Sequence, residues 1–115
     1  MKVLIVDDSA VIRMMVKKMI SDAYPEADIT FAKDGNEALS VIKNHDFDVY
    51  TIDFNMPGAD GEEVAHFAKQ KSPNAKICML TANKQQAIRD KAESIGVKFL
   101  VKPHFQNELI AFLKD

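Results

Sequence analysis

The sequence predicts an α/β domain in which a parallel sheet of five strands is covered by helices on both faces. Short apolar runs alternate with helical patterns along the whole chain, and this alternation is typical of parallel α/β sheets. Most of the runs are continuous and rich in β-branched residues, as expected for strands buried on both faces. Right-handed crossovers then give a doubly wound fold, for which two strand orders are common. Periodicity alone does not choose between these orders.

Five segments have the composition of strands. The segment Ile29–Ala32 alternates between apolar and polar residues, which suits a strand at the edge of the sheet. The other four are continuous apolar runs that suit buried positions: Val3–Val6, Val49–Ile52, Ile77–Leu80 and Phe99–Val101. No internal repeat or linker interrupts this series.

The helices between these strands are marked mainly by their ends. Ser9 can cap a first helix that ends near Tyr24. Asp34 and Asp60 each stand three residues before a Glu, which is the pattern of a capping box. Gly96 is placed to close the fourth helix. A fifth helix is predicted from the spacing of Phe105, Leu109, Phe112 and Leu113.

Length and composition indicate one compact domain spanning residues 1–115. An apolar content of 47% is enough for a core without disulfides, and Cys78 is the only cysteine. No apolar stretch reaches the roughly 18 residues that span a bilayer. The net charge of −2, with both signs interspersed, argues against direct binding to nucleic acid or membrane. We therefore expect a cytoplasmic protein.

Polar residues follow four of the five predicted strands at their carboxyl ends. Asp7 and Asp8 follow the first strand, Asp53 the third, Thr81 the fourth and Lys102 the fifth. Ligands of open α/β sheets bind outside these strand ends. We therefore expect all five side chains to meet in one crevice.

Three carboxylates in one crevice repel one another unless a cation supplies charge. Oxygen ligands without nearby His or Cys favour Mg²⁺ over zinc. A carboxylate beside Mg²⁺ can attack a phosphoryl group, and Asp53 is the best placed nucleophile. Lys102 would then pair with one phosphoryl oxygen, and the Thr81 hydroxyl would donate to another.

This ordered set resembles the CheY-like response-regulator receiver family. The matching segments are Asp7-Asp8, Asp53–Gly58, Thr81-Ala82 and Lys102-Pro103, and the resemblance covers essentially the entire chain. It implies a flavodoxin-like (βα)5 fold with strand order 2-1-3-4-5. It also implies a phosphorylation-operated switch of a two-component phosphorelay.

The resemblance assigns roles around the metal. It implies that Asp8 and Asp53 ligate Mg²⁺ directly, that Asp7 acts largely through water, and that the backbone carbonyl of Asn55 completes the protein ligands. It also implies a cis peptide bond between Lys102 and Pro103, which is uncommon even before proline.

The resemblance further implies a route from phosphorylation to output. A histidine kinase or histidine phosphotransfer protein would phosphorylate Asp53, and Thr81 with Phe99 would form a switch pair. Turning of the Phe99 ring would change the face of the fourth helix, fifth strand and fifth helix, and a downstream protein, plausibly in chemotaxis, would read that face. We expect no turnover of an external metabolite. The chain would be a monomer or a phosphorylation-dependent dimer, and either a stand-alone regulator or the receiver of a longer protein.

Simpler interpretations exist for each of these residues. Asp7 and Asp8 could cap the first helix, and Thr81 could cap the fourth. Asp53 could serve only the turn that follows it. Phe99 could be an ordinary core residue.

A few residues have no place in this scheme. His104 stands directly after Lys-Pro, where the family commonly has a hydrophobic residue; here Phe105 comes one residue later. The histidines form no ligand pair and are interpreted as solvated: His45, His66 and His104. Three methionines of the first helix are expected to fill the core: Met14, Met15 and Met19.

Two rival classes share some of these features. A Mg²⁺-dependent aspartyl-phosphate hydrolase resembling the haloacid dehalogenases would need a second Asp two residues after the nucleophile, where this chain has Asn55. A flavodoxin-like flavin carrier would need a Gly-rich and hydroxyl-rich phosphate loop after the first strand, where this chain has Asp7–Ser9.

Overall fold

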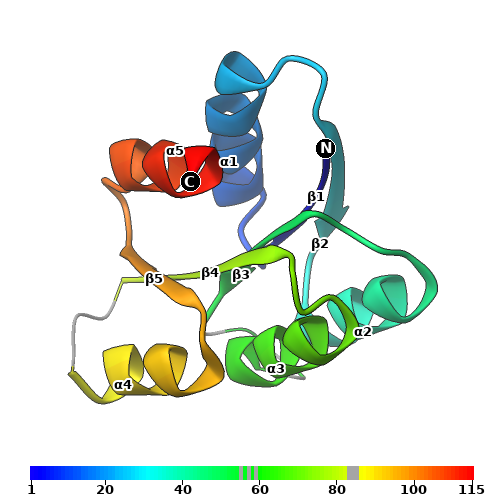
Figure 1. Cartoon of the computed structure of the whole chain (residues 1–115), viewed down its shortest axis with the longest axis vertical. Helices are drawn as coiled ribbons and strands as arrows, with labels where there is room; N and C mark the ends of the chain where they lie inside the picture. Colours follow the sequence, from blue (N-terminus) through cyan, green and yellow to red (C-terminus); the bar gives the residue numbers. More distant parts are fainter. Residues whose placement is uncertain (55, 57, 59, 83–85) are drawn as a thin grey trace.

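The computed structural model describes residues 1–54, 56, 58, 60–82 and 86–115. Strands and helices alternate along these residues, as the sequence pattern predicts (Figure 1). In chain order the elements are β1 (Lys2–Val6), α1 (Ala10–Ala23), β2 (Asp28–Ala32), α2 (Gly35–Asn44), β3 (Val49–Asp53), α3 (Gly61–Lys71), β4 (Lys76–Thr81), α4 (Gln86–Ile95), β5 (Lys98–Val101) and α5 (Gln106–Lys114).

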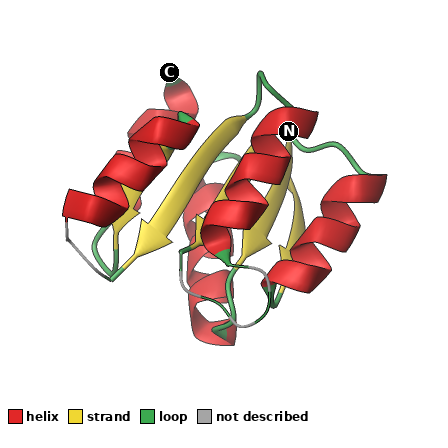
Figure 2. Cartoon of the chain, turned by 90° about the horizontal axis from the view of Figure 1, so that it is seen from below, coloured by secondary structure: helices red, strands yellow, loops and turns green. Residues whose placement is uncertain are grey.

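The strands form one parallel sheet in the order β2-β1-β3-β4-β5. This is the order that the family resemblance implies, and the alternating segment Ile29–Ala32 lies at the sheet edge as expected. Helices α1 and α5 cover one face, and α2, α3 and α4 cover the other (Figure 1). Figure 2 shows the strands running in one direction between these two layers. None of the described helices is long and apolar enough to cross a bilayer.

Each face of the sheet has its own apolar cluster. One cluster joins β1, β3, β4 and β5 to α1 and α5, and it contains the buried thiol of Cys78. Burial raises the pKa of Cys78 to about 12, so the thiol behaves as a small apolar side chain. The second cluster joins the sheet to α2, α3 and α4. The three inner strands are buried on both faces, which explains their continuous apolar runs.

The predicted helix ends are confirmed, with one change of detail. Ser9 accepts a hydrogen bond from the Ile12 amide at 3.3 Å. Asp34 and Asp60 accept from the amides three residues later at 2.8 and 2.9 Å. The Glu37 carboxylate accepts from the Lys33 amide, one residue before the cap, so the return bond of a standard capping box is shifted by one residue. Gly96 closes α4 with a φ of +83°.

The structure corrects one expectation about apolar residues, that for Met14, and shows the role of Phe105. Met14 is 56% exposed, so it does not fill the core, because α1 turns this position away from the sheet. Met19 is buried as expected. Phe105 is fully buried directly before α5, so it, and not the exposed His104, provides the apolar side chain after the Lys-Pro pair.

Lysine side chains fasten the carboxyl ends of two helices, where main-chain carbonyls lack partners within the helix. The Lys71 ammonium donates to the carbonyls of Ile42 and His45 at the end of α2. The Lys76 ammonium donates to the carbonyls of Phe112, at 2.7 Å, and Asp115 at the end of α5. Lys76 thus ties α5 to the first residue of β4.

The hydroxyl of Thr51 is a buried side-chain polar atom without a hydrogen-bond partner among the described residues. Leaving such a group unpaired costs free energy. We expect Thr51→Val to raise the free energy of unfolding by about 1 kcal/mol, because valine keeps the shape and removes the hydroxyl. Urea denaturation measures this change. Thr51→Ser is the control and should lower stability, since it keeps the hydroxyl and removes a methyl group; a loss of stability in Thr51→Val would contradict the prediction.

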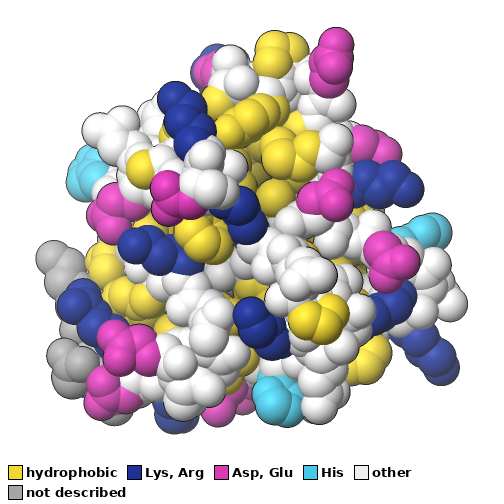
Figure 3. Space-filling view, in the orientation of Figure 1, with side chains coloured by type: hydrophobic (Ala, Val, Ile, Leu, Met, Phe, Trp, Pro, Cys, Tyr) yellow, Lys and Arg dark blue, Asp and Glu magenta, His cyan; other side chains and the backbone are white. Residues whose placement is uncertain are grey.

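Charged side chains of both signs are interspersed over the face shown in the space-filling view (Figure 3). This distribution agrees with the net charge of −2. Among the described residues on this face, no single sign of charge forms a broad patch.

Candidate functional site

Three polar residues of the predicted site lie on one side of the sheet because of strand geometry. Side chains alternate between the two faces of a strand. Asp7, Asp53 and Lys102 continue the rows of β1, β3 and β5 that pack against α1 and α5. The parallel strands end at the same edge, so the three side chains converge there.

Lys102 bridges the two buried carboxylates. Its Nζ lies 2.8 Å from Asp7 Oδ2 and 3.2 Å from Asp53 Oδ1. The side chains of Asp7 and Asp53 are only 2% and 8% exposed. Burial lowers the pKa of Lys102, but hydrogen bonding and charge attraction from Asp7 and Asp53 outweigh it, so the pKa lies above its ordinary value. The ammonium therefore remains charged and fixed between the two acids.

Asp7 is held in place by its main chain as well as by its side chain. Its Oδ1 accepts from the Ser9 amide at 2.9 Å, and its amide donates to the Ala32 carbonyl. Its own carbonyl accepts from Arg13 Nη1 at 2.7 Å. Arg13 was not predicted from the sequence, although its position one turn into the helix that follows the acidic pair was an available signal.

The three predicted acidic residues are close enough to share a metal ion. Asp7, Asp8 and Asp53 each offer a carboxylate oxygen, and these oxygens lie within 4.8 Å of one another. Asp8 is exposed while the other two are buried, so the cluster opens to solvent on the Asp8 side. An all-oxygen donor set that keeps access to water suits Mg²⁺. The residues present thus fit the metal that the sequence predicts.

The predicted switch residues lie on neighbouring strands. Thr81 ends β4, is 1% exposed and pairs in register with Val101. Phe99 stands two residues before Val101 on β5. It therefore lies on the same face of the sheet as Thr81, diagonally across from it. Its ring is half-buried and packs against the α2–α3–α4 cluster. The main chain links the two strand ends, because the Lys102 amide donates to the Thr81 carbonyl at 2.7 Å.

Two further expectations concern the loops beside these strands. The peptide bond between Lys102 and Pro103 is cis, as the resemblance implies. Asn55, the remaining predicted metal ligand, lies outside the described residues.

Gly61 is a site residue that was not predicted from the sequence, although it directly follows Asp60, the predicted cap of the third helix. A Cβ atom at this position would lie 2.2 Å from the Asp53 carbonyl oxygen and 2.7 Å from Phe54 Cα. The Gly61 amide also donates to the Phe54 carbonyl at 3.1 Å. Helix α3 therefore begins directly against the main chain of Asp53, an approach that only glycine allows.

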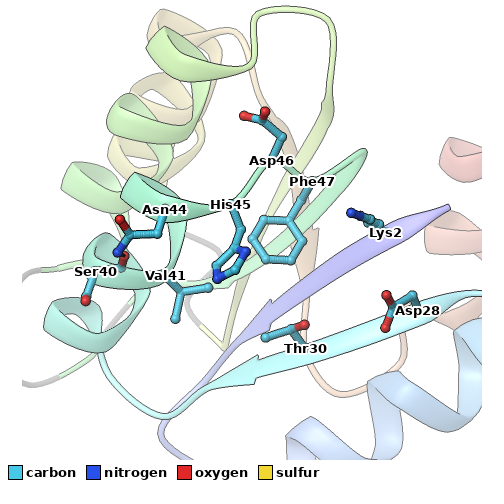
Figure 4. A pocket seen from close by; sticks show the side chains of 9 residues that line it. All are labelled: Lys2, Asp28, Thr30, Ser40, Val41, Asn44, His45, Asp46 and Phe47. Carbon is cyan, nitrogen blue, oxygen red and sulfur yellow. Dashed lines mark hydrogen bonds between the residues drawn. The ribbon is translucent and has the colours of Figure 1, made fainter.

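A separate pocket of about 500 Å³ lies at the opposite end of the sheet (Figure 4). Its lining includes Lys2 and Asp28 at the starts of β1 and β2, and His45 after α2. Ligands of open α/β sheets bind at the carboxyl ends of strands. The strand ends that carry Asp53 and Lys102 therefore remain the candidate functional site.

A doubly wound fold with acidic residues and a lysine at the strand ends defines a class of receiver-like α/β domains. The chain belongs to the response regulator receiver domain family, whose model matches residues 3–114. The five residues predicted from the strand ends all fall within this match.

Several relatives share this domain at similar sequence identities. The chemotaxis protein CheY of Thermotoga maritima is 37% identical over 113 residues, which cover 97% of this chain and 93% of that protein. The protein-glutamate methylesterase/protein-glutamine glutaminase of the same organism is 35% identical, but the match covers only 30% of its length. The receiver family thus includes a full-length match to a small chemotaxis protein and a partial match to a larger protein named as an enzyme.

Solved structures show the same fold. The chemotaxis response regulator CheY4 of Vibrio cholerae superposes with a TM-score of 0.84 at 34% identity, covering 98% of this chain and 95% of that one. The response regulator TrrA of Thermotoga maritima, in complex with Mg²⁺ and BeF, has a TM-score of 0.84 at 30% identity and covers 98% and 96% of the two chains.

Proposed function

We propose that this receiver domain is a phosphorylation-operated switch in which Asp53 accepts a phosphoryl group from a histidine kinase or a histidine phosphotransfer protein. The observation that carries the proposal is the Lys102 ammonium, which lies between Asp7 and Asp53 beside the third carboxylate, Asp8. The complex of TrrA with Mg²⁺ and BeF also supports it, since TrrA shares the fold and 30% of its sequence.

In the proposed reaction a carboxylate oxygen of Asp53 attacks phosphorus on the donor histidine. The new O–P bond forms as the N–P bond breaks, and the imidazole nitrogen keeps the electron pair of that bond. Lys102 stays paired with Asp7 and reaches the phosphoryl oxygens from its place beside Asp53. The Thr81 hydroxyl, at the end of the next strand, donates to another of these oxygens.

Mg²⁺ is the proposed cofactor. We infer that Asp8 and Asp53 hold it directly, that Asp7 acts through water, and that the carbonyl of Asn55 completes the set. When bound, Mg²⁺ neutralises charge that builds up on the phosphoryl oxygens. The exposed position of Asp8 leaves this side open for ligands from solvent.

The proposed output is a change at the face formed by α4, β5 and α5. Thr81 moves toward the phosphoryl group and the Phe99 ring turns inward, which shifts the population between two arrangements of this face. A downstream protein reads the change, and the CheY relatives favour a partner in chemotaxis. We propose a cytoplasmic single domain spanning residues 1–115 that acts as a monomer or a phosphorylation-dependent dimer.

In this proposal the domain catalyses only its own phosphorylation and dephosphorylation. The match to a methylesterase covers 30% of that protein, which is the extent expected if the two share only the receiver domain. Asn55 occupies the position where an aspartyl-phosphate hydrolase would need its second Asp. Turnover of assorted phosphate esters by the domain would favour the hydrolase instead.

We expect the full chain to form a one-to-one adduct with beryllofluoride, and to gain one phosphoryl group from acetyl phosphate, only when Mg²⁺ is present. Asp53→Asn should abolish both, because the amide lacks the nucleophilic oxygen. Intact-mass spectrometry measures the phosphoryl adduct. Asp34→Asn is the matched control, since Asn also caps helices and Asp34 lies at the start of α2. An adduct on Asp53→Asn, or none on the unchanged chain, would contradict the proposal.

A further inference from the structure

Helix α4 carries two cations that lie over aromatic rings next to the proposed reaction and switch residues. Arg89 Cζ is 5.3 Å from the centroid of the Phe99 ring. Lys91 Nζ is 5.9 Å from the centroid of the Phe54 ring and 3.6 Å from a carboxylate oxygen of Glu62. Both distances are within the range of cation–π attraction.

We propose that Arg89 is a positioning residue that holds Phe99 in the arrangement of the unphosphorylated domain. The proposal rests on the function proposed above, because it concerns the equilibrium of the same switch. The Arg89 side chain is exposed at the surface of α4, and the half-buried Phe99 ring contacts both this side chain and the α2–α3–α4 cluster. The guanidinium therefore covers the outer side of the ring.

In the proposed switch this contact is made in only one of the two arrangements of the ring. Thr81 lies on the same face as Phe99 but two positions further along the paired strands. A ring that turns toward Thr81 moves away from the surface, and so away from Arg89. A contact made in only one of two arrangements favours that arrangement by the free energy of the contact. Arg89 thus favours the unphosphorylated arrangement. Activation requires that phosphorylation favour the other arrangement by a larger free energy.

Lys91 provides an internal comparison on the same helix. Its ring partner, Phe54, directly follows β3, and the main chain there is held by two hydrogen bonds: the Phe54 amide donates to the Leu80 carbonyl at 2.9 Å, and the Phe54 carbonyl accepts from the Gly61 amide at 3.1 Å. Phe54 is not one of the two proposed switch residues. Removal of Lys91 deletes one positive charge and one cation–π contact from α4 without affecting the position of Phe99.

The test is a titration of the full chain with beryllofluoride at saturating Mg²⁺, followed by NMR of the amides of β5. We expect Arg89→Gln to lower the half-saturating beryllofluoride concentration by about two- to fivefold, the range for an exposed cation–π contact. Arg89→Lys, which keeps a cation, should remain near the unchanged chain. Lys91→Gln should also remain near it, although it removes the same charge. An unchanged or raised half-saturating concentration in Arg89→Gln would overturn the proposal.

A double-mutant cycle assigns the effect to the aromatic ring. In a Phe99→Leu background, Arg89→Gln should cause no further change in the half-saturating concentration. An equal change in both backgrounds would show that Arg89 acts elsewhere and would overturn the proposal. Failure of the unchanged chain to bind beryllofluoride would overturn the proposed function itself, whereas binding without an Arg89→Gln shift would overturn only the role of Arg89.

Discussion

Lys102→Met is expected to reduce the rate of phosphorylation of Asp53 by at least about 100-fold, the effect typical of removing one charged group that stabilises a transition state. Lys102 lies 3.2 Å from Asp53, so it is placed to meet the phosphoryl oxygens. Phosphorylation by acetyl phosphate, followed by intact mass, measures the rate. Lys98→Met is the matched control: Lys98 is exposed at the start of the same strand. Unchanged phosphorylation in Lys102→Met would contradict the role of Lys102.

The same substitution tests how much the charge of Lys102 stabilises the folded domain. Without Lys102, two buried carboxylates lose their shared cation, so in EDTA we expect a loss of about 3 kcal/mol in the free energy of unfolding. The folded-state pKa of Lys102 lies above its ordinary value of 10.5. Its stabilisation is therefore complete below that value and is lost as pH rises through the folded-state pKa. Urea denaturation should show a constant difference between the two proteins from about pH 7 to about pH 9, and a smaller one above 10.5. A difference in the free energy of unfolding that grows as pH rises would contradict stabilisation by the charged Lys102 ammonium.

Gly61→Ala is expected to damage both stability and the reaction. The added Cβ would lie 2.2 Å from the Asp53 carbonyl oxygen, so either α3 or the end of β3 must move. We expect the free energy of unfolding to fall by about 3 kcal/mol, the upper part of the range for overpacking. Adduct formation should weaken as well, because the displaced main chain carries Asp53. Urea denaturation and a beryllofluoride titration measure the two effects.

Gly96→Ala is the control, because it shows what the replacement of a glycine far from Asp53 does to stability and to adduct formation. Gly96 has a φ of +83°, and a Cβ there would lie 3.8 Å from the Lys69 side chain, which leaves space but strains the backbone. We expect a loss of about 1 kcal/mol, with adduct formation unchanged. If Gly61→Ala behaved like Gly96→Ala in both measurements, the close approach of α3 to Asp53 would have no functional importance.

Much of the fold could be predicted because the spacing of apolar residues clearly distinguishes the strands from the helices in this chain. The strand ends also revealed Asp7, Asp53 and Lys102, since side-chain alternation and parallel pairing bring them to one edge. The strand order required the family resemblance, because crossover patterns alone allow two orders. Spacing therefore predicted which residues meet, and the resemblance supplied the arrangement of the strands between them.

Other features depend on tertiary contacts that no local pattern records. The closeness of Gly61 to Asp53 depends on the angle at which α3 meets β3. The position of Arg13 one turn into the first helix is visible in the sequence, but its contact with the Asp7 carbonyl depends on how α1 leaves the sheet. Met14 was assigned to the core because apolar residues in a helix usually face inward, but the first helix has more of them than its inner face can hold.

Strand β4 serves two purposes at its two ends. Its first residue, Lys76, ties down the last turn of α5, and its last residue, Thr81, ends the strand that pairs with β3, which carries Asp53. Helix α5, one side of the proposed output face, is thus anchored to the strand that carries the proposed switch residue Thr81, while α4 forms the other side. A binding partner that contacts both helices would therefore detect a displacement of α4 relative to α5.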